Sequence, residues 1–374
     1  MSSINILFIT PKLPKKDSEV FYVFIKEEIE ELRKSGYING IVFNFNYEEL
    51  FNALTQLLRV VTVNNSIEIV HAHFAVPYGL VGNTVARILR RPLIITVHGF
   101  DILMDKQLGY GINRFSIMRR LTRFILSKSC KVIANSLALK RECVRHGVPP
   151  SKVVVIPYGV NIQMFYPMSN SELEEKLPAN LMRIFKERES YVNILCAKRL
   201  EKIYGIEYLI KAIKVLINKG VKNFRTIFVG GGNQFKNYLS LVNQLGLSEN
   251  VIFFNLVPRK IMPLFYNICD FTVVPSMVEG FGLVVAESLA CGRPVIGTSV
   301  GGILDQVIDG FNGFLVPSRD FLSLADRIQT LIQDDDVRKR MSCNARVFAE
   351  SHLDLRKRIL RVIDLYRSMI ENDA

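Results

Sequence analysis

The sequence lacks any long uninterrupted hydrophobic run. Its apolar stretches, such as the one around Asp270–Pro275, are short and broken by charge, whereas a helix that spans a membrane needs about 20 consecutive apolar residues. Met1–Thr10 leads directly into a predicted strand and has no signal-peptide layout. We therefore expect no spanning segment and a cytoplasmic location.

Residues with the spacing of a metal or redox centre are also missing. No two of the six cysteines form a zinc or redox pair, and most lie in apolar contexts typical of small buried hydrophobes. Asp334–Asp336 precedes a helical pattern, where acidic residues favour a helix start, so we predict a helix cap there. The other histidines form no ligand set, and they are His71, His73, His146 and His352. We expect no metal and no other cofactor.

Acidic residues are scarce between Arg87 and Arg145. This stretch contains thirteen lysines and arginines, opposed only by Asp101, Asp105 and Glu142, in a chain of net charge +13. Such a patch attracts phosphates, nucleic acid or an anionic membrane surface. Gly111–Cys130 combines five of these charges with apolar residues at helical spacing. It is either a peripheral membrane helix or a helix packed on its own sheet with a solvated basic face.

The remaining pattern is that of an α/β protein with two domains. The 374 residues suit two domains of about 150–200 residues, and short β-branched runs alternate with helical patterns, which predicts two doubly wound parallel sheets. We place the domains at residues 1–167 and 191–351, with a linker and a short helix over 168–190. An amphipathic helix over His352–Met369 lies in a C-terminal segment, 352–374, that we expect to pack back on the first domain. Strands are predicted at Ile4–Ile9, Ile41–Phe43, Ile67–Ala72, Leu93–Val97, Val132–Ala134, Val153–Ile156, Asn193–Ala197, Arg225–Val229, Val251–Phe254, Phe271–Val274, Pro294–Gly297 and Gly313–Val316.

The most informative segment is Val274–Gly302. It begins at a strand end, turns through Glu279-Gly280-Phe281-Gly282, and continues as an apolar helix from Leu283. Glycines let the backbone approach a ligand, and a helix N-terminus suits a diphosphate. Glu287 follows among apolar residues, where an unpaired carboxylate is costly and the two hydroxyls of a ribose would pair it.

This segment resembles the donor motif of family 4 glycosyltransferases, which have the GT-B fold of two Rossmann-like sheets facing across a cleft. Two glutamates separated by seven residues, in EGFGLVVAESLACGRPVI, carry the resemblance together with Gly301-Gly302. Further similar segments occur in the same order, namely VHGFD (Val97–Asp101), IANS (Ile133–Ser136), PYGVN (Pro157–Asn161), VGGG (Val229–Gly232) and GFLVP (Gly313–Pro317). The resemblance covers nearly the whole chain.

The resemblance implies a retaining transfer from a nucleoside diphosphate sugar to a glycan or lipid-linked acceptor, in polysaccharide or glycolipid biosynthesis. Glu287 would hold the ribose, Glu279 would contact sugar hydroxyls beside the reacting centre, and His98 would lie near the transferred sugar. Backbone amides at Phe281, Gly282 and Leu283 would hold the diphosphate or the sugar. Substrate contacts are also assigned to Gly280, to Gly231 at the floor of the donor site, and to Asp101 in the segment of His98.

Cations would stabilise the leaving diphosphate in a site without a metal. The family usually supplies an arginine and a lysine after the first strand of the second domain. Arg199 matches the arginine, Ile203 and Tyr204 occupy the stretch of the lysine, and Lys198 and Lys202 are both candidates to replace it. The loop Thr10–Phe21 lacks the glycines usual in the family, so the acceptor is not specified.

Three other functions are weighed against a hexosyltransferase. A sugar-nucleotide epimerase could use the same scaffold, but the spaced glutamates argue against it. A non-catalytic partner subunit could keep the donor fold and lose acceptor chemistry. A nucleic-acid binder would use the basic patch, but no nucleic-acid motif is visible and no such partner is expected. The basic patch instead favours peripheral contact with the inner face of the cell membrane.

Overall fold

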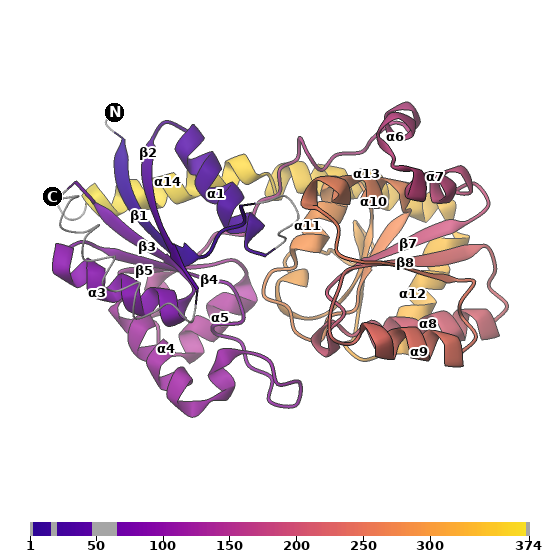
Figure 1. Cartoon of the computed structure of the whole chain (residues 1–374), viewed down its shortest axis with the longest axis horizontal. Coiled ribbons are helices and arrows are strands. Elements are labelled where there is room, and N and C mark those ends of the chain that lie inside the picture. The colour runs from indigo at the N-terminus through magenta and orange to yellow at the C-terminus, as the bar shows by residue number, and fades with distance from the viewer. Residues whose placement is uncertain (1–2, 16–20, 47–65, 372–374) are drawn as a thin grey trace. The chain divides into compact units, whose positions relative to one another are not determined.

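The computed structural model describes residues 3–15, 21–46 and 66–371. The chain divides into two compact units, of which the first comprises Met1–Tyr158 and Leu355–Ala374 and the second comprises Gly159–Asp354. Each unit is built around a parallel sheet with helices around it (Figure 1), so the predicted α/β class is confirmed. Part of the glycine-free loop lies outside the described residues. Among those described, no helix has the length and apolarity needed to cross a membrane.

The sheet of the first unit has the strand order β2-β1-β3-β4-β5-β6, and all its described pairings are parallel. The strands are β1 (Ile4–Pro11), β2 (Ile38–Phe45), β3 (Ile69–His73), β4 (Leu93–Val97), β5 (Lys131–Ala134) and β6 (Val153–Val155). Their central strands are buried on both faces, which explains why they read as continuous apolar runs.

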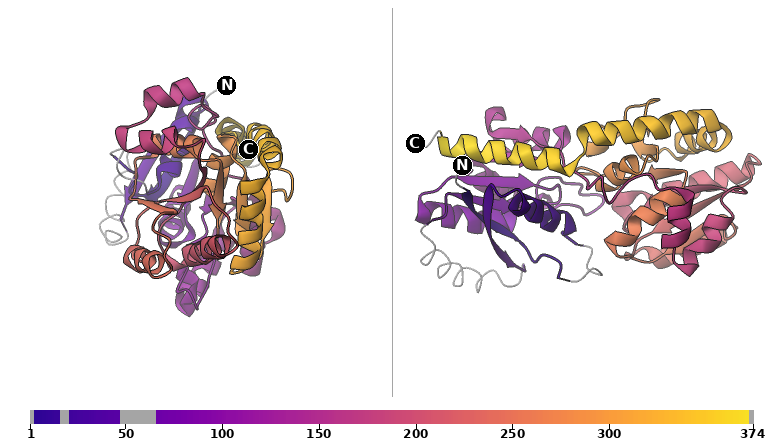
Figure 2. Two further views of the ribbon diagram at one scale, coloured as in Figure 1. Left: turned by 90° about the vertical axis from the view of Figure 1, so that its right-hand side faces the viewer. Right: turned by 90° about the horizontal axis from the view of Figure 1, so that it is seen from above.

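Helices cover both faces of this sheet. One apolar core joins it to α3 (Leu80–Leu89), α4 (Ser116–Lys128) and α5 (Leu137–Arg145). A second core on the opposite face joins it to α1 (Val23–Lys34) and to the C-terminal α14 (Leu355–Glu371), which contacts α1 (Figure 2). Short turns complete the unit, namely η2 (Ala75–Gly79), η3 (Ile112–Arg114) and η4 (Pro150–Lys152).

The sheet of the second unit has the strand order β12-β11-β10-β7-β8-β9, again parallel throughout. Its strands are β7 (Val192–Ala197), β8 (Phe224–Val229), β9 (Val251–Phe254), β10 (Phe271–Val274), β11 (Val295–Thr298) and β12 (Gly313–Val316). In this doubly wound order the chain adds strands on one side of the sheet from β7 to β9 and then on the other side from β10 to β12. The strand order therefore reverses between the neighbouring strands β7 and β10. Ligands of such folds bind beyond the carboxyl ends of the strands at that reversal.

The helices of the second unit are α6 (Asn170–Lys176), α7 (Ala179–Lys186), α8 (Ile206–Asn218), α9 (Phe235–Gln244), α10 (Met262–Ile268), α11 (Leu283–Ala290), α12 (Phe321–Gln333) and α13 (Asp335–His352), with turns η5 (Lys202–Tyr204), η6 (Arg259–Ile261) and η7 (Gly301–Ile303). Helices α8 and α12 pack together on the sheet through a core of buried apolar residues.

The segment between the two sheets differs from the predicted division. The first unit ends at Tyr158 rather than at residue 167, and the predicted linker 168–190 contains two helices of the second unit. Helix α6 begins with a capping box between Ser169 and Glu172, a local signal that the predicted single short helix did not use. The C-terminal region forms α13 and α14 separated at Leu353–Asp354, and α14 belongs to the first unit.

Candidate active site

The reversal point of the second sheet brings together the loops that follow β7 and β10. Lys198 comes directly after β7, and Ser276 and Glu279 follow β10. Because β7 and β10 are neighbours, these loops meet at the carboxyl edge of the sheet. The EGFG turn and α11, where Leu283 is the first residue, continue from the same loop. The strand order therefore places the predicted donor motif where doubly wound folds bind ligands.

Glu279 is held by two groups from these loops. Its Oε2 accepts hydrogen bonds from Lys198 Nζ at 2.5 Å and from Ser276 Oγ at 2.9 Å. The side chains of Lys198 and Glu279 are 6% and 13% exposed, so the pair is largely shielded from water. The Lys198 ammonium also lies 5.1 Å from the ring centroid of Tyr204. Burial alone would lower the pKa of Lys198, but Glu279 and Tyr204 outweigh burial and the pKa is raised. Lys198 therefore stays charged.

Glu287 projects from α11 into a second buried ion pair. Arg259 Nη1 donates to its Oε1 and Tyr266 Oη donates to its Oε2 at 2.8 Å. The Glu287 side chain is 5% exposed, and burial together with the neighbouring carboxylate raises the pKa of Tyr266 well above its usual value. Arg259 also stacks over the ring of Phe165 at 5.0 Å. Arg259 and Tyr266 thus already donate to the Glu287 carboxylate, and each of its oxygens can accept a further hydrogen bond.

Glycines allow the turn between the two glutamates to pack tightly. Gly282 ends the turn with φ +91°, a left-handed conformation that favours glycine. Gly301, with φ +54°, lies so close to the turn that a Cβ there would approach the Glu279 carbonyl oxygen to 1.7 Å. Gln306 Nε2 donates to the carbonyl of Phe281 at 2.6 Å. Gly280, Phe281 and Gly282 are buried by these contacts and form a fixed platform in front of α11.

The other predicted residues of this unit lie at the same edge of the sheet. Arg199 is exposed and pairs with Glu201 at 3.3 Å, and Lys202 is exposed in η5. Gly231 follows β8, and a Cβ there would meet the Leu256 side chain at 3.2 Å. Of the two candidate lysines, Lys198 alone is buried beside Glu279.

His98 and Asp101 follow β4 in the first unit. Asp101 is 1% exposed, and its carboxylate accepts from the backbone N–H groups of Ala75, His98 and Gly99 at 2.9, 3.0 and 3.0 Å. Burial raises the pKa of Asp101 and these three bonds oppose the rise. The structure therefore shows Asp101 fixing the loop that carries His98.

The His98 ring is bonded at both nitrogens. Tyr158 Oη lies 2.5 Å from Nδ1, and His73 Nδ1 lies 3.3 Å from Nε2. Burial first, then the positive charge of Arg358, lowers the pKa of His98 well below its usual value, so the imidazole is neutral. His71 bonds Tyr366 and Thr96 instead, and its pKa is lowered to about 3 by burial and by Arg358.

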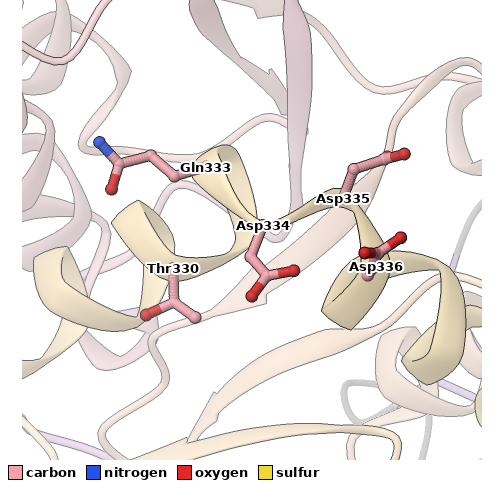
Figure 3. Close-up of a pocket in the computed structure, with 5 residues that line it drawn as sticks. All are labelled: Thr330, Gln333, Asp334, Asp335 and Asp336. Atoms are coloured by element: carbon pink, nitrogen blue, oxygen red, sulfur yellow. The ribbon is translucent and has the colours of Figure 1, made fainter.

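Candidate metal ligands do not gather in the described parts of the chain. Among these residues, no three His, Cys, Asp or Glu side chains are placed to hold an ion. Asp334 is the N-cap of α13 and accepts from the Val337 N–H at 2.9 Å, as predicted. Asp335 pairs with Arg338 and Lys339, both at 2.6 Å. Figure 3 shows these aspartates beside Thr330 and Gln333 in a surface pocket at the start of α13.

Sequence reasoning missed Arg259, Tyr266 and Tyr158, whose hydroxyl bonds His98 Nδ1. Arg259 begins the turn η6 in the loop that follows β9, so a basic residue in the loop after a predicted strand was a usable signal. Tyr266 lies in α10, 21 residues before its partner Glu287, and has no local signature.

Comparisons with known proteins agree with this geometry. Residues 6–164 match the model of Glycosyltransferase Family 4, and residues 179–348 match that of Glycosyl transferases group 1. An uncharacterized glycosyltransferase of Methanocaldococcus jannaschii is 30% identical over 75% of this chain and 70% of its own length. The capsular polysaccharide biosynthesis glycosyltransferase CapM of Staphylococcus aureus is 29% identical over 81% and 77%.

A solved structure shares the fold. The crystal structure of Anabaena HepE in complex with UDP-glucose superposes with a TM-score of 0.78 at 22% identity, covering 98% of this chain and all of that one. The matched families, the relatives and this fold agree with the glutamate motif at the sheet reversal. The chain is a glycosyltransferase that belongs to family 4 and has the GT-B fold.

Proposed function

We propose that this enzyme moves a hexose, with retention of anomeric configuration, from a nucleoside diphosphate sugar to a glycan or lipid-linked acceptor. The observation that carries the proposal is the pairing of Lys198 with Glu279, at 2.5 Å, beside the glycine turn that opens α11. A buried anion, a buried cation and a helix N-terminus at one sheet edge suit a substrate that carries both hydroxyls and a diphosphate.

Each group has a role in this proposal. Glu287 accepts from the ribose hydroxyls in addition to Arg259 and Tyr266. The backbone at Gly282 and Leu283 receives the diphosphate at the start of α11. Lys198 pairs with Glu279 and holds its carboxylate toward the sugar, and the exposed Arg199 supplies the second cation for the leaving group. Charge compensation by protein groups means that catalysis proceeds without a metal.

The structures and relatives supply a first donor and acceptor class to test. Anabaena HepE was crystallised with UDP-glucose, and CapM acts in capsular polysaccharide biosynthesis by name. A UDP-hexose and a polysaccharide precursor, free or lipid-linked, are therefore the first pair to assay. The comparisons identify a transferase, so the epimerase and nucleic-acid alternatives are not retained.

The basic patch of the first unit supports contact with an anionic membrane. Helix α4 buries Ile125 and Leu126 but exposes Ile117 and Phe124. Arg119, Arg120 and Arg123 are exposed on the same helix. The sheet therefore covers only part of the apolar stripe, and the uncovered part is surrounded by cations, as in helices that lie in a lipid headgroup layer.

The test is release of free nucleotide from a panel of UDP-, GDP- and ADP-hexoses, with and without acceptor. One donor should give acceptor-dependent release, the product anomer should match the donor anomer, and excess EDTA should leave the rate unchanged. A product of inverted anomeric configuration would refute retention. A rate that is lost in EDTA and restored by magnesium would refute catalysis without a metal. Nucleotide binding by calorimetry without any turnover would instead identify the non-catalytic subunit.

A further inference from the structure

The carboxamide of Gln306 packs against the glycine turn that opens α11. Gln306 is 1% exposed and lies in the loop that follows η7. Its Nε2 donates to the carbonyl oxygens of Phe281, Gly302 and Gly282 at 2.6, 3.2 and 3.4 Å. A carbonyl can only accept, so the atom that faces these oxygens is the amide nitrogen. Gln306 Oε1 has no hydrogen-bond partner within the described parts of the chain. Every side-chain hydrogen bond of Gln306 there thus goes to the turn and to the glycine packed on it.

These bonds fix the direction of a backbone N–H group. A peptide unit is planar and trans, so its C=O and N–H point in opposite directions. The Phe281 carbonyl shares a peptide unit with the Gly282 N–H. Because this carbonyl points at Gln306, the Gly282 N–H points to the opposite side of the turn. The next carbonyl, that of Gly282, accepts from the Val285 N–H at 2.9 Å in the first turn of α11, so the Leu283 N–H points out of the helix N-terminus.

The two N–H groups lack an acceptor in the protein. Neither the Gly282 N–H nor the Leu283 N–H meets one among the residues that the structure describes. Gly282 is buried, and an unpaired N–H in a buried position is rare because it costs free energy. Gly282 has φ +91° and Leu283 begins a right-handed helix, and successive N–H groups in such a pair form a concave site for an anion. The missing partner is therefore an anionic oxygen.

A buried cation with unused donors lies next to the turn. A Cβ on Gly282 would lie 3.5 Å from Glu279 Cγ, and Glu279 Oε2 accepts from Lys198 Nζ at 2.5 Å. An ammonium carries three hydrogens, and within the described residues Lys198 uses one of them, for Glu279. The Lys198 side chain is only 6% exposed. Its other two hydrogens thus also call for a ligand rich in acceptor oxygens.

We propose that Gln306 is a positioning residue for the diphosphate of the donor, because it turns the Phe281 carbonyl away from the phosphate and aims the Gly282 N–H at it. The identity of the anion rests on the proposed function, whereas the direction of the N–H follows from the contacts of the turn. Without Gln306 the peptide unit between Phe281 and Gly282 is free to rotate. Rotation removes a donor and presents a carbonyl oxygen to the phosphate, which repels it.

The experiment reads this peptide unit directly in the full-length protein. Phe281-Gly282 is the only Phe-Gly dipeptide in the sequence, so deuterated protein labelled with 1-¹³C-phenylalanine and ¹⁵N-glycine gives a single carbonyl-to-amide NMR signal. UDP should move the amide proton of this signal downfield, as a hydrogen bond to phosphate does, and uridine should move it little. Gln306→Met keeps the length of the side chain but cannot donate. It should shift the carbonyl frequency and abolish most of the response to UDP.

Two outcomes of this measurement would overturn the proposal. One is a Gly282 signal that stays unmoved in wild type saturated with UDP, because the N–H then does not contact the diphosphate. The other is an equal response to UDP in wild type and in Gln306→Met, because the side chain then does not orient the peptide unit.

Affinities separate positioning from damage to the fold. Gln306→Met should bind UDP about tenfold more weakly or worse, since a hydrogen bond to a charged group is lost, and should bind uridine, measured by displacement calorimetry, like wild type. The matched control is Asn193→Leu. Asn193 is a fully buried carboxamide that donates to the Ile268 carbonyl at 3.1 Å, at the end of β7 opposite to Lys198. This control should lose stability and keep both affinities. Equal losses of UDP and uridine affinity in Gln306→Met would contradict the proposal.

Inorganic pyrophosphate, used as a second probe, distinguishes this proposal from the proposed function. If pyrophosphate moves the Gly282 signal in wild type but not in Gln306→Met, and UDP does not bind, the nucleotide-sugar function fails and the role of Gln306 stands. If UDP binds and leaves the signal unmoved, the donor function stands and the role of Gln306 fails. If neither probe moves the signal, the role of Gln306 is refuted.

Discussion

At the residue scale, the pairing of Glu287 defines the sharpest test of the donor site. Glu287→Gln keeps the size of the side chain but removes its charge, and hydrogen bonds to a charged group contribute about 1.5–3 kcal/mol each. We expect the affinity for UDP, measured by calorimetry, to fall at least about tenfold. Glu249→Gln makes the same charge change at an exposed site and should bind like wild type. If the two variants bind UDP with equal affinity, Glu287 is not part of the donor site.

The Lys198–Glu279 pair makes a second prediction at this scale. Lys198→Met leaves a carboxylate buried without its cation, and breaking such a pair costs about 3–5 kcal/mol. Urea unfolding should show this loss, and turnover should disappear. Lys198→Met combined with Glu279→Leu should regain most of the stability and none of the turnover. If Lys198→Met alone is as stable as wild type, Lys198 and Glu279 do not form the buried ion pair described here.

At the element scale, helix α4 predicts membrane binding that depends on charge. Each lysine or arginine near an anionic leaflet contributes about 1 kcal/mol, so Arg119, Arg120 and Arg123 changed together to serine should release the protein from phosphatidylserine vesicles in co-sedimentation. Wild-type binding should rise with the anionic lipid content and fall with added salt.

The control removes three charges elsewhere. Lys222, Lys236 and Arg340 are exposed residues of the second unit, and their joint change to serine lowers the net charge equally. This control should sediment with vesicles like wild type. If both triple variants lose binding alike, overall charge rather than α4 is responsible, and a protein that stays in solution at low salt refutes membrane contact.

Secondary structure was largely predictable from the sequence at this scale. All twelve predicted strands are present. The central ones are recognisable because strands buried on both faces are short apolar runs between helices. The EGFG turn and α11 were also predicted, since glycines and helix periodicity are local signals. The long-range side-chain contacts were not predictable. Arg358 bonds Glu28 across 330 positions of the chain, and only the fold brings these residues together.

At the scale of the whole molecule, the two units should respond differently to acid. The first unit holds His71, His73, His98 and His146, whose pKa values are all lowered, chiefly by burial. The second unit contains one histidine, His352. In the unfolded chain these groups bind protons below about pH 6.5, whereas in the folded unit they stay neutral. Their contribution to stability is therefore complete above pH 6.5 and declines as the pH falls, for His71 down to about 3.

Hydrogen exchange at pH 7.0 and 5.5, corrected for intrinsic rates, measures this difference within one sample. Opening free energies of β3, β4 and β5 should fall by up to about 1.4 kcal/mol per pH unit for each histidine, while those of β7 and β10 should change little. The raised pKa of Asp101 acts in the opposite direction, but it is one group against four. Equal changes in the two units would contradict the prediction.

The return of the chain to the first unit has a consequence for how the protein is made. Helix α14 supplies Val362, Ile363 and Tyr366 to the core on one face of the first sheet, and it is synthesised after the whole second unit. The second unit is one continuous stretch, Gly159–Asp354, and can finish folding while that face is still open. The half that leaves the ribosome first is therefore completed last, and its uncovered apolar face needs protection from aggregation during the interval.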